Sequence, residues 1–169
     1  MIVRVATLDD VEAISTMYRD FFTFHAHMQP DYYKAAEAGE YPANSIRSED
    51  NDIIVVEVDG NIAGFAHVFE NRTSPYDSVV SHRFAHLMDL YVSPLHRETG
   101  LGRALIKATK DWAKKRNLDY IELTLLAENE NAARLYAQEN FKTVMHTMRC
   151  TLELEEIVGI DGHEKERKA

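Results

Sequence analysis

The feature of this sequence that most constrains its fold is the stretch from Leu87 to Leu105, where the residue pattern changes from that of a strand to that of a helix. The strand pattern ends at Val92, a short loop follows, and the helical pattern opens at two glycines, Gly100 and Gly102. The first backbone amides of a helix have no partner within the helix, and the helix dipole adds partial positive charge to them. The stretch therefore predicts a strand–loop–helix unit whose helix start binds an anion such as a pyrophosphate.

Residue types exclude two common phosphate-binding loops. The Walker pattern requires Lys and then Ser or Thr after its second glycine, whereas Gly102 is followed by Arg103 and Ala104. The dinucleotide fingerprint requires a third glycine at a position that Leu105 occupies. Two glycines at a helix start are also found in ordinary turns, so the interpretation depends on the pattern of the surrounding chain.

Apolar periodicity divides the chain into strands and helices. Strands are predicted over residues 2–5, 52–58, 62–69, 84–92, 120–126 and 143–154, and helices over residues 9–22, 100–116 and 131–139. Thr7 and Asp10 have the spacing of a capping box at the start of the first helix. Residues 23–50 lack a clean period, so we expect an irregular, ligand-facing segment there, with a short helix over 31–38.

This order of elements predicts an α/β (α+β) domain with a mixed, mostly antiparallel sheet of about six to seven strands flanked by helices. A doubly wound dinucleotide-binding fold would alternate strands and helices from the start. With 169 residues, the chain can bury about two-thirds of its unfolded surface, which suffices for one domain without disulfides or structural metal. We expect that domain over residues 1–154, followed by a charged tail over 155–169.

The composition of the chain indicates the cellular compartment of the protein. Cys150 is the single cysteine and cannot form an internal disulfide, which favours a reducing compartment. The apolar runs are far shorter than the ~20 residues of a membrane span, and the N-terminus lacks the pattern of a secretory signal. We therefore expect a cytoplasmic protein without a membrane association.

The charge of the chain is unevenly distributed. A formal net charge of −9 argues against nucleic-acid binding, which depends on phosphate neutralisation by Lys and Arg. Residues 19–59 carry nine acidic and three basic side chains, whereas residues 94–117 carry seven basic and two acidic ones. Either these are solvated faces, or the basic segment attracts an anionic ligand and the acidic segment a cationic one.

Taken together, the motifs resemble the GCN5-related N-acetyltransferase (GNAT) family. The acetyl-CoA loop of that family, Arg/Gln-x-x-Gly-x-Gly/Ala, matches residues 97–102 after Val92-Ser93-Pro94. A second family motif, Asn-x-x-Ala-x-x-x-Tyr followed by Gly-Phe, matches Asn129, Ala132 and Tyr136. Asn140 replaces the usual glycine, and Asn also tolerates the left-handed conformation of a helix C-cap.

The resemblance covers residues 2–154, including the opening Arg4 to Asp10, and implies an N-acetyltransferase that uses acetyl-CoA as cosubstrate. The backbone of the strand would contact the pantetheine arm, the loop amides would hold the pyrophosphate, and the second motif would reach the arm and the sulfur. The implied cofactor-binding residues are Leu90, Tyr91, Val92, Arg97, Glu98, Thr99, Gly100, Leu101, Gly102, Arg103, Asn129, Ala132 and Tyr136. Lys107 and Lys110 either reach the 3′-phosphate or form a solvated helix face, of which we favour the solvated face.

The resemblance also implies Tyr136 as the general acid. A Tyr hydroxyl (pKa ~10) is a weaker acid than a thiol (pKa ~8.5) by about 1.5 units, or ~2 kcal/mol. Asp89 and His86 are both candidates for the general base, and Glu122 could act through water. Because positions 86 and 89 differ in parity, these two side chains would point to opposite faces of a regular strand unless a bulge intervenes.

Direct transfer is expected because no motif activates Cys150 as a nucleophile. Aromatic and acidic side chains together can bind a cationic amine, which would be a small molecule or a peptide. The candidate amine-binding residues are Tyr33, Glu37 and Glu40, with Tyr32 and Tyr41 nearby. An acyl-CoA-binding regulatory module without turnover and a protein N-terminal or lysine acetyltransferase remain as alternatives. No metal is expected, because His25 and His27 lack companion ligands. Apolar strands at the sheet edge and the strand at 143–154 are compatible with a homodimer.

Overall fold

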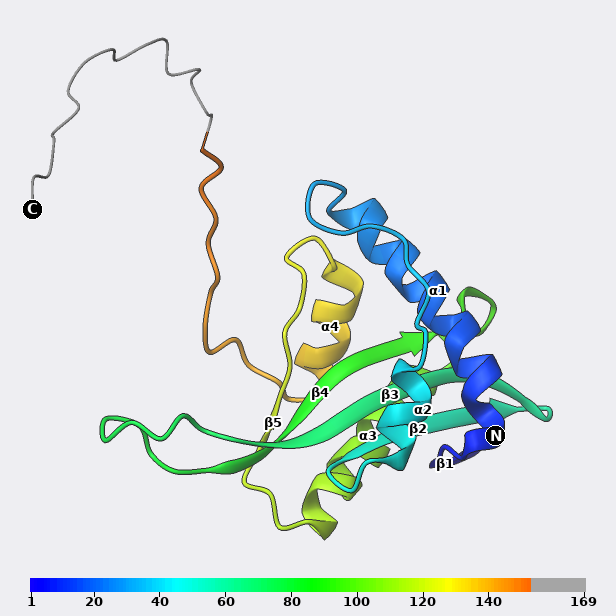
Figure 1. Ribbon diagram of the computed structural model, residues 1–169, viewed down its shortest axis with the longest axis horizontal. Helices are drawn as coiled ribbons and strands as arrows, with labels where there is room; N and C mark the ends of the chain where they lie inside the picture. Colours follow the sequence, from blue (N-terminus) through cyan, green and yellow to red (C-terminus); the bar gives the residue numbers. More distant parts are fainter. Residues whose placement is uncertain (153–169) are drawn as a thin grey trace, which may run out of the picture.

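The computed structural model describes residues 1–152 and shows one twisted sheet with helices on both faces (Figure 1). The strands are β1 (Ile2–Val5), β2 (Asn51–Val58), β3 (Asn61–Arg72), β4 (Arg83–Val92) and β5 (Ile121–Glu122). The α-helices are α1 (Val11–Met28), α2 (Tyr41–Arg47), α3 (Leu101–Lys115) and α4 (Glu130–Gln138), and short 3₁₀ turns occupy Leu8–Asp10 and Pro94–His96. The strand order is β1-β2-β3-β4-β5, antiparallel except for the parallel pair of β4 and β5. None of the helices within residues 1–152 is long and apolar enough to cross a membrane.

The sheet is buried on both faces, as the unbroken apolar run of β2 requires. Ile54 and Val56 belong to a core that α3 covers with Leu105 and Trp112. Ile53 and Val55 belong to a second core, which α1 covers. The predicted α+β fold with a mixed, mostly antiparallel sheet is confirmed, and the two layers of helices follow from this two-sided burial.

The first helix is longer than predicted. Thr7 donates its backbone N–H to Asp10 over 2.8 Å, which confirms the capping interaction, but α1 continues past residue 22 to Met28. Phe21 and His25 pack against each other with ring centroids 4.2 Å apart, so the added turn stays attached to the core. The helix ends shortly before Pro30, which cannot continue the hydrogen-bonding pattern of a helix.

The helix predicted over residues 31–38 is wrong, because this segment forms turns and irregular chain. The helix in this region is α2, at Tyr41–Arg47, within the segment that was predicted to be irregular. Pro42 stands in its first turn, where a missing N–H costs nothing, and Ala43 is buried. A helix of two turns is too short to display a clear period, which explains why the pattern did not reveal it.

The predicted strand count of six to seven is also wrong for the described residues, which form five strands. Of the strand predicted over 120–126, only Ile121–Glu122 pairs, and residues 143–152 are extended without strand pairing. A strand requires a neighbouring chain to accept and donate its hydrogen bonds, and periodicity alone cannot supply one. Residues 153 and 154 and the tail predicted over 155–169 lie outside the described residues.

Candidate active site

The sheet opens where β4 and β5 diverge (Figure 1). They pair only at Ala85 with Ile121 and at His86 with Glu122, whereas β4 continues to Val92. Within residues 1–152, no strand pairs with this edge of β4 beyond His86. Unpaired backbone N–H and C=O groups at such an edge are available to an extended ligand. The predicted cofactor-binding residues Leu90, Tyr91 and Val92 all lie along it.

The loop that follows β4 leads directly into a helix start rich in free amides. In the part of the chain that the structure describes, the backbone N–H groups from Glu98 to Arg103 donate no backbone hydrogen bond. Gly100 is the N-cap of α3 with φ +90°, a conformation that strains any residue with a Cβ. Amides without partners at a helix start carry partial positive charge and are of the kind that binds phosphate groups.

Gly102 has a packing role besides the predicted one. A Cβ atom at this position would lie 3.0 Å from Cδ2 of Leu135, so the glycine allows α4 to approach α3 closely. Arg103 donates a hydrogen bond to Gln138 near the end of α4. Lys110 also holds α4, with its Nζ 2.9 Å from both the backbone oxygen and the carboxylate of Glu139.

Two other basic side chains of this region are also engaged within the protein. Lys107 is exposed and pairs with Asp111 over 2.9 Å, which is the arrangement of a solvated helix face. Arg97 donates its Nε–H to the backbone oxygen of Val92 over 3.2 Å and lies over the ring of Phe24. Arg97 therefore joins the loop to the end of β4 and to α1.

A bulge in β4 brings the two candidate bases to one face. His67 of β3 pairs with Asp89 and the next residue, Val68, pairs with Leu87, so Met88 is the extra residue. Phe69 pairs with His86 and stacks on its ring at 5.0 Å. Because the bulge cancels the difference in parity, His86 and Asp89 both face the side covered by α1 and α2.

Asp89 lies in a polar cluster inside the aromatic core beneath α1. Tyr18 donates its hydroxyl to the Asp89 carboxylate over 3.0 Å, and Nδ1 of His67 lies 3.7 Å from the same carboxylate oxygen. The hydroxyl of Tyr41 forms a hydrogen bond of 2.9 Å with Nδ1 of His67. We call Tyr18, Tyr41, His67 and Asp89 the Asp89 cluster.

Sequence reasoning missed three members of the Asp89 cluster. Tyr18 matched the apolar face of the first helix, and Tyr41 was only grouped with the aromatic residues of the acceptor side. The available signal was His67, the one polar residue of the predicted strand over 62–69. Its side chain is buried, and its Nε2 atom has no hydrogen-bond partner within residues 1–152. A buried polar group of this kind requires an explanation beyond packing.

Burial and the charge of Asp89 change the acidity of the surrounding groups. Burial, assisted by Asp89, raises the pKa of Tyr41 to about 12 and also raises the pKa of Tyr18. Burial lowers the pKa of His86, against the attraction of Glu122, whose carboxylate lies 4.0 Å from Nδ1. Both tyrosines are therefore protonated donors at neutral pH, and His86 is uncharged there.

Tyr136 of α4 belongs to the core on the α3 side and contacts Phe141 edge to face, with ring centroids 5.5 Å apart. Burial, and secondarily the charge of Asp89, raises the pKa of the Tyr136 hydroxyl to about 12. Asn129 caps α4 by accepting the backbone N–H of Ala132 over 3.2 Å, and its NH₂ group donates no hydrogen bond within residues 1–152. Asn140 has φ +67°, which confirms the predicted left-handed cap.

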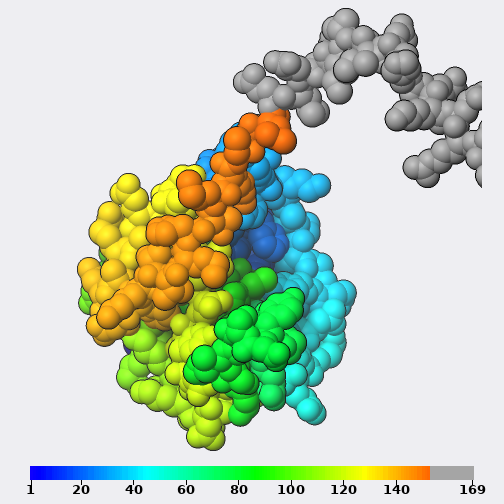
Figure 2. All heavy atoms as spheres, turned by 90° about the vertical axis from the view of Figure 1, so that its left-hand side faces the viewer, coloured from blue at the N-terminus to red at the C-terminus, as the bar shows by residue number. Residues whose placement is uncertain are grey.

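The predicted amine-binding side chains lie in the loop between α1 and α2. Tyr33 contacts His25 edge to face at 5.6 Å, and Glu37 forms an exposed ion pair with Arg19 at 3.6 Å. Glu40 is exposed at the start of α2. Figure 2 shows the face where this loop approaches α4 and residues 142–152.

The acidic residues of the segment 19–59 are not gathered on this face. Asp52 accepts a hydrogen bond from Trp112 of α3 over 2.6 Å, and Glu57 lies 3.4 Å from Arg4 of β1. Both pairs are remote in the fold from the α1–α2 loop. Only some of the acidic residues of the segment 19–59 therefore lie on the side where the acceptor amine is expected.

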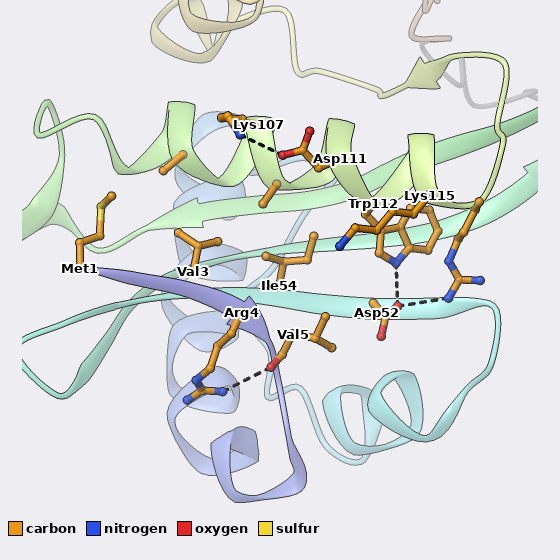
Figure 3. Close-up of a pocket in the computed structure, with 13 residues that line it drawn as sticks. Met1, Val3, Arg4, Val5, Asp52, Ile54, Lys107, Asp111, Trp112 and Lys115 are labelled. Atoms are coloured by element: carbon orange, nitrogen blue, oxygen red, sulfur yellow. Dashed lines mark hydrogen bonds and ion pairs between the residues drawn. The ribbon is translucent and has the colours of Figure 1, made fainter.

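A pocket of about 650 Å³ lies between β1, β2 and α3 (Figure 3). Its apolar lining, including Val3, Ile54 and Trp112, belongs to the core on the α3 side, opposite the face that carries Asp89. Two pairs of its polar side chains contact each other, Arg116 with Asp52 at 3.3 Å and Lys107 with Asp111 at 2.9 Å. This pocket contains none of the free amides or candidate bases, and the candidate site is the β4–β5 opening.

An opening between two parallel strands, beside a helix start with free amides, suits an extended ligand that carries phosphate groups. The Acetyltransferase (GNAT) family pattern matches residues 11–141, and the chain belongs to this family. The family uses acetyl-CoA as cosubstrate, and the free amides of residues 98–103 fit its pyrophosphate. The protein is therefore an N-acetyltransferase.

Several relatives carry similar sequences. An uncharacterised N-acetyltransferase of Bacillus subtilis is 27% identical over 84% of this chain and 90% of its own length. An uncharacterised N-acetyltransferase of Methanocaldococcus jannaschii is 28% identical over 83% of this chain, which spans only 60% of that protein. The streptothricin acetyltransferase of Streptomyces lavendulae is 29% identical over 61% of this chain and half of its own length.

The fold is shared with solved structures. A mutant of the BH1408 protein from Bacillus halodurans superimposes with a TM-score of 0.83 at 23% identity, covering 90% of this chain and all of that chain. At this identity the likeness establishes the fold and leaves the substrate open.

Proposed function

We propose that this enzyme transfers the acetyl group of acetyl-CoA directly to the primary amine of a small cationic molecule or peptide. The observation that carries the proposal is the position of Asp89. This carboxylate is fixed by Tyr18 near the β4–β5 opening, and its charge acts on Tyr136, which packs in the core on the other face of the sheet. Asp89 can thus accept the proton of the amine while Tyr136 donates a hydrogen bond to the thiolate of CoA in the same reaction.

The loop and strand edge would hold the cosubstrate. The six free amides from Glu98 to Arg103 are proposed to bind the pyrophosphate, and the open edge of β4 from Leu90 to Val92 to bind the pantetheine arm. A backbone N–H on that edge would also stabilise the oxyanion that develops on the thioester carbonyl. The free NH₂ group of Asn129 would contact the arm.

Asp89 is the proposed general base. An alkyl ammonium has a pKa of ~10.4, so its proton must be removed before the nitrogen can attack the thioester carbon. Asp89 would take one proton from the ammonium, directly or through a water beside His86, and the neutral nitrogen would then attack. As the C–N bond forms and the C–S bond breaks, the nitrogen loses its second proton to solvent and the thiolate of CoA leaves. His86 is the alternative base, because the bulge directs it to the same face.

Tyr136 is the proposed donor to the leaving thiolate. Its raised pKa of about 12 exceeds that of a thiol (~8.5) by about 3.5 units, so complete proton transfer would cost about 5 kcal/mol. A hydrogen bond from the Tyr136 hydroxyl to the developing thiolate avoids that cost. Cys150 is exposed, and no basic side chain hydrogen-bonds its thiol within residues 1–152, which supports transfer without an acyl-enzyme.

The acceptor class is inferred from the α1–α2 loop. Tyr33 offers an aromatic face, and Glu37 and Glu40 offer carboxylates to an ammonium group. The similarity to a streptothricin acetyltransferase supports a small-molecule acceptor over a protein.

The test is a panel of mono- and polyamines and peptides with acetyl-CoA, monitored by release of free CoA. We expect turnover with small polyamines, and we expect Asp89→Asn to lower kcat by about 10²- to 10⁴-fold, because general-base catalysis contributes that much. The affinity for CoA should be unchanged in this variant. His86→Gln is the matched control and should have the smaller effect.

Two results would contradict the proposal. A larger loss with His86→Gln than with Asp89→Asn would transfer the role of base to His86. Tight acetyl-CoA binding without CoA release for any amine or peptide would instead indicate an acyl-CoA-binding regulatory module.

A further inference from the structure

The pocket between β1, β2 and α3 has no part in the proposed acetyl transfer. Its volume of about 650 Å³ lies within the range of about 300–1,000 Å³ that is usual for small-molecule sites. Its apolar lining comes from both the sheet and the helix, namely from Val3, Val5, Ile54, Ala104, Ala108 and Trp112. Figure 3 shows Val3 and Ile54 pointing from the strands toward α3. The pocket thus has apolar walls on two sides.

The pocket follows α3 over several turns. Its lining runs from Ala104 to Lys115, which corresponds to about 16 Å of helix. One side is open to solvent, because β1 is the edge strand of the sheet and Val5 is 49% exposed. Exposed apolar surface that gathers in one hollow is typical of a binding site. A ligand of matching shape is elongated and mostly apolar.

The charged side chains of the pocket leave one cation unpaired. Lys107 pairs with Asp111 at 2.9 Å, and Arg116 pairs with Asp52 at 3.3 Å. Arg4 also lines the pocket, but its guanidinium binds Asp10, which is not a lining residue. Lys115 is the remaining basic lining residue, and it forms no ion pair or hydrogen bond within residues 1–152. The pocket therefore carries one uncompensated positive charge.

This charge lies at one end of the apolar walls. Lys115 is the last residue of α3, and Figure 3 shows its amino group turned toward the space between α3 and β2. A single anionic group at the end of an apolar chain is complementary to this arrangement. The nearby carboxylates of Asp52 and Asp111 oppose a multiply charged anion such as a phosphate ester, and Lys115 itself opposes a cationic head group.

We propose that this pocket binds a fatty acid, with the alkyl chain between α3 and the β1 edge and the carboxylate at Lys115. Burial of the chain against Val3, Ile54 and Trp112 supplies most of the affinity. Lys115 selects the anionic head group and fixes the direction in which the chain lies. The fatty acid is a second ligand of the protein, bound on the opposite side of the sheet from Asp89.

The fluorescence of Trp112 tests the proposal, because Trp112 is the single tryptophan of the chain and lines the pocket. The full chain is titrated with dodecanoate below its micelle-forming concentration, and we expect a saturable change in fluorescence. The same titration in saturating CoA should give the same Kd, because the acetyl-CoA site is elsewhere. Dodecylamine has the same chain with a cationic head, and acetate has the carboxylate without the chain. Neither should give a saturable change.

Two lysine variants test the role of the head group. Lys115→Glu replaces an attraction by a repulsion, so the Kd of dodecanoate should rise about 5- to 20-fold. Lys114→Glu is the matched control, since Lys114 is the neighbouring residue and does not line the pocket, and it should leave the Kd nearly unchanged. Both lysines are exposed, so neither variant should fail to fold.

Four results would each overturn the proposal. The first is the absence of a saturable change in Trp112 fluorescence with dodecanoate, and the second is equally tight binding of dodecylamine. The third is loss of dodecanoate binding in saturating CoA, which would place the fatty acid in the acetyl-CoA site. The fourth is an equal effect of the two lysine variants, which would indicate unspecific attraction to basic surface. None of these measurements involves acetyl transfer, so the outcome is independent of the proposed function.

Discussion

Asp89 illustrates how much a single residue depends on its surroundings. Its carboxylate accepts the hydroxyl of Tyr18, and His67 holds Tyr41 beside it. Tyr18 and His67 are buried, so their positions are fixed by packing rather than by solvent. Such support from a second layer of groups keeps a base in its productive orientation.

Tyr136 gives the first prediction at this scale. Tyr136→Phe removes only the hydroxyl, and we expect kcat to fall by about 10- to 100-fold because the thiolate loses its hydrogen bond, with the CoA dissociation constant nearly unchanged. Because the pKa of Tyr136 is raised to about 12, its hydroxyl remains protonated and should cause no loss of kcat between pH 8 and pH 10. Steady-state kinetics and CoA titration measure these quantities.

Tyr120→Phe is the matched control for that variant. Tyr120 stacks on Phe84 at 4.9 Å, outside the β4–β5 opening, so removing its hydroxyl should leave kcat unchanged. If both variants keep full turnover, Tyr136 has no chemical role and serves only in packing.

At the scale of elements, β1 and the start of α1 are joined by a paired charge. Arg4 binds the carboxylate of Asp10 through two hydrogen bonds of 2.7 Å and 2.9 Å, and Asp10 is 8% exposed. The hydrogen bond from Arg4 is the main cause that lowers the pKa of Asp10 from 3.8 to about 2. This pair fixes the angle at which the chain leaves the edge strand and enters the helix.

Asp10→Asn should therefore lower the free energy of unfolding by about 1–2 kcal/mol at pH 7, an amount that allows for the partial exposure of Arg4. Because the pKa of Asp10 is lowered on folding, this contribution is complete above about pH 5 and disappears as the pH falls through 4 toward 2. Urea unfolding at pH 7 and pH 2.5 measures the difference. Asp9→Asn, at an exposed neighbouring position, should have little effect; equal losses for both variants would contradict the role of the pair.

At the scale of the whole molecule, two cores lie on opposite faces of one sheet, and the candidate site lies where the sheet opens. The core beneath α1 contains the Asp89 cluster, and the core beneath α3 contains Tyr136. The proposed base, Asp89, and the proposed hydrogen-bond donor, Tyr136, therefore lie on opposite faces of the sheet. Their relative position depends on the divergence of β4 from β5.

Local patterns predicted much of the fold. The strands predicted over 52–58, 62–69 and 84–92 and the helices predicted over 100–116 and 131–139 are present, because their periods are contained in short stretches of sequence. The strand predicted over 143–154 had an equally clear pattern, yet residues 143–152 pair with no strand among residues 1–152. The periodicity of a segment indicates which secondary structure it favours, whereas strand pairing depends on which segment lies beside it in the fold.

The sequence by itself determined the family, the helix start at Gly100 and the left-handed cap at Asn140, since each depends on residues close together in the chain. Only the tertiary structure decided that a bulge at Met88 turns His86 and Asp89 to one face, and that Tyr18, Tyr41 and His67 gather around Asp89. A bulge depends on the register between two strands, and a buried cluster on contacts between distant elements, neither of which a local pattern encodes.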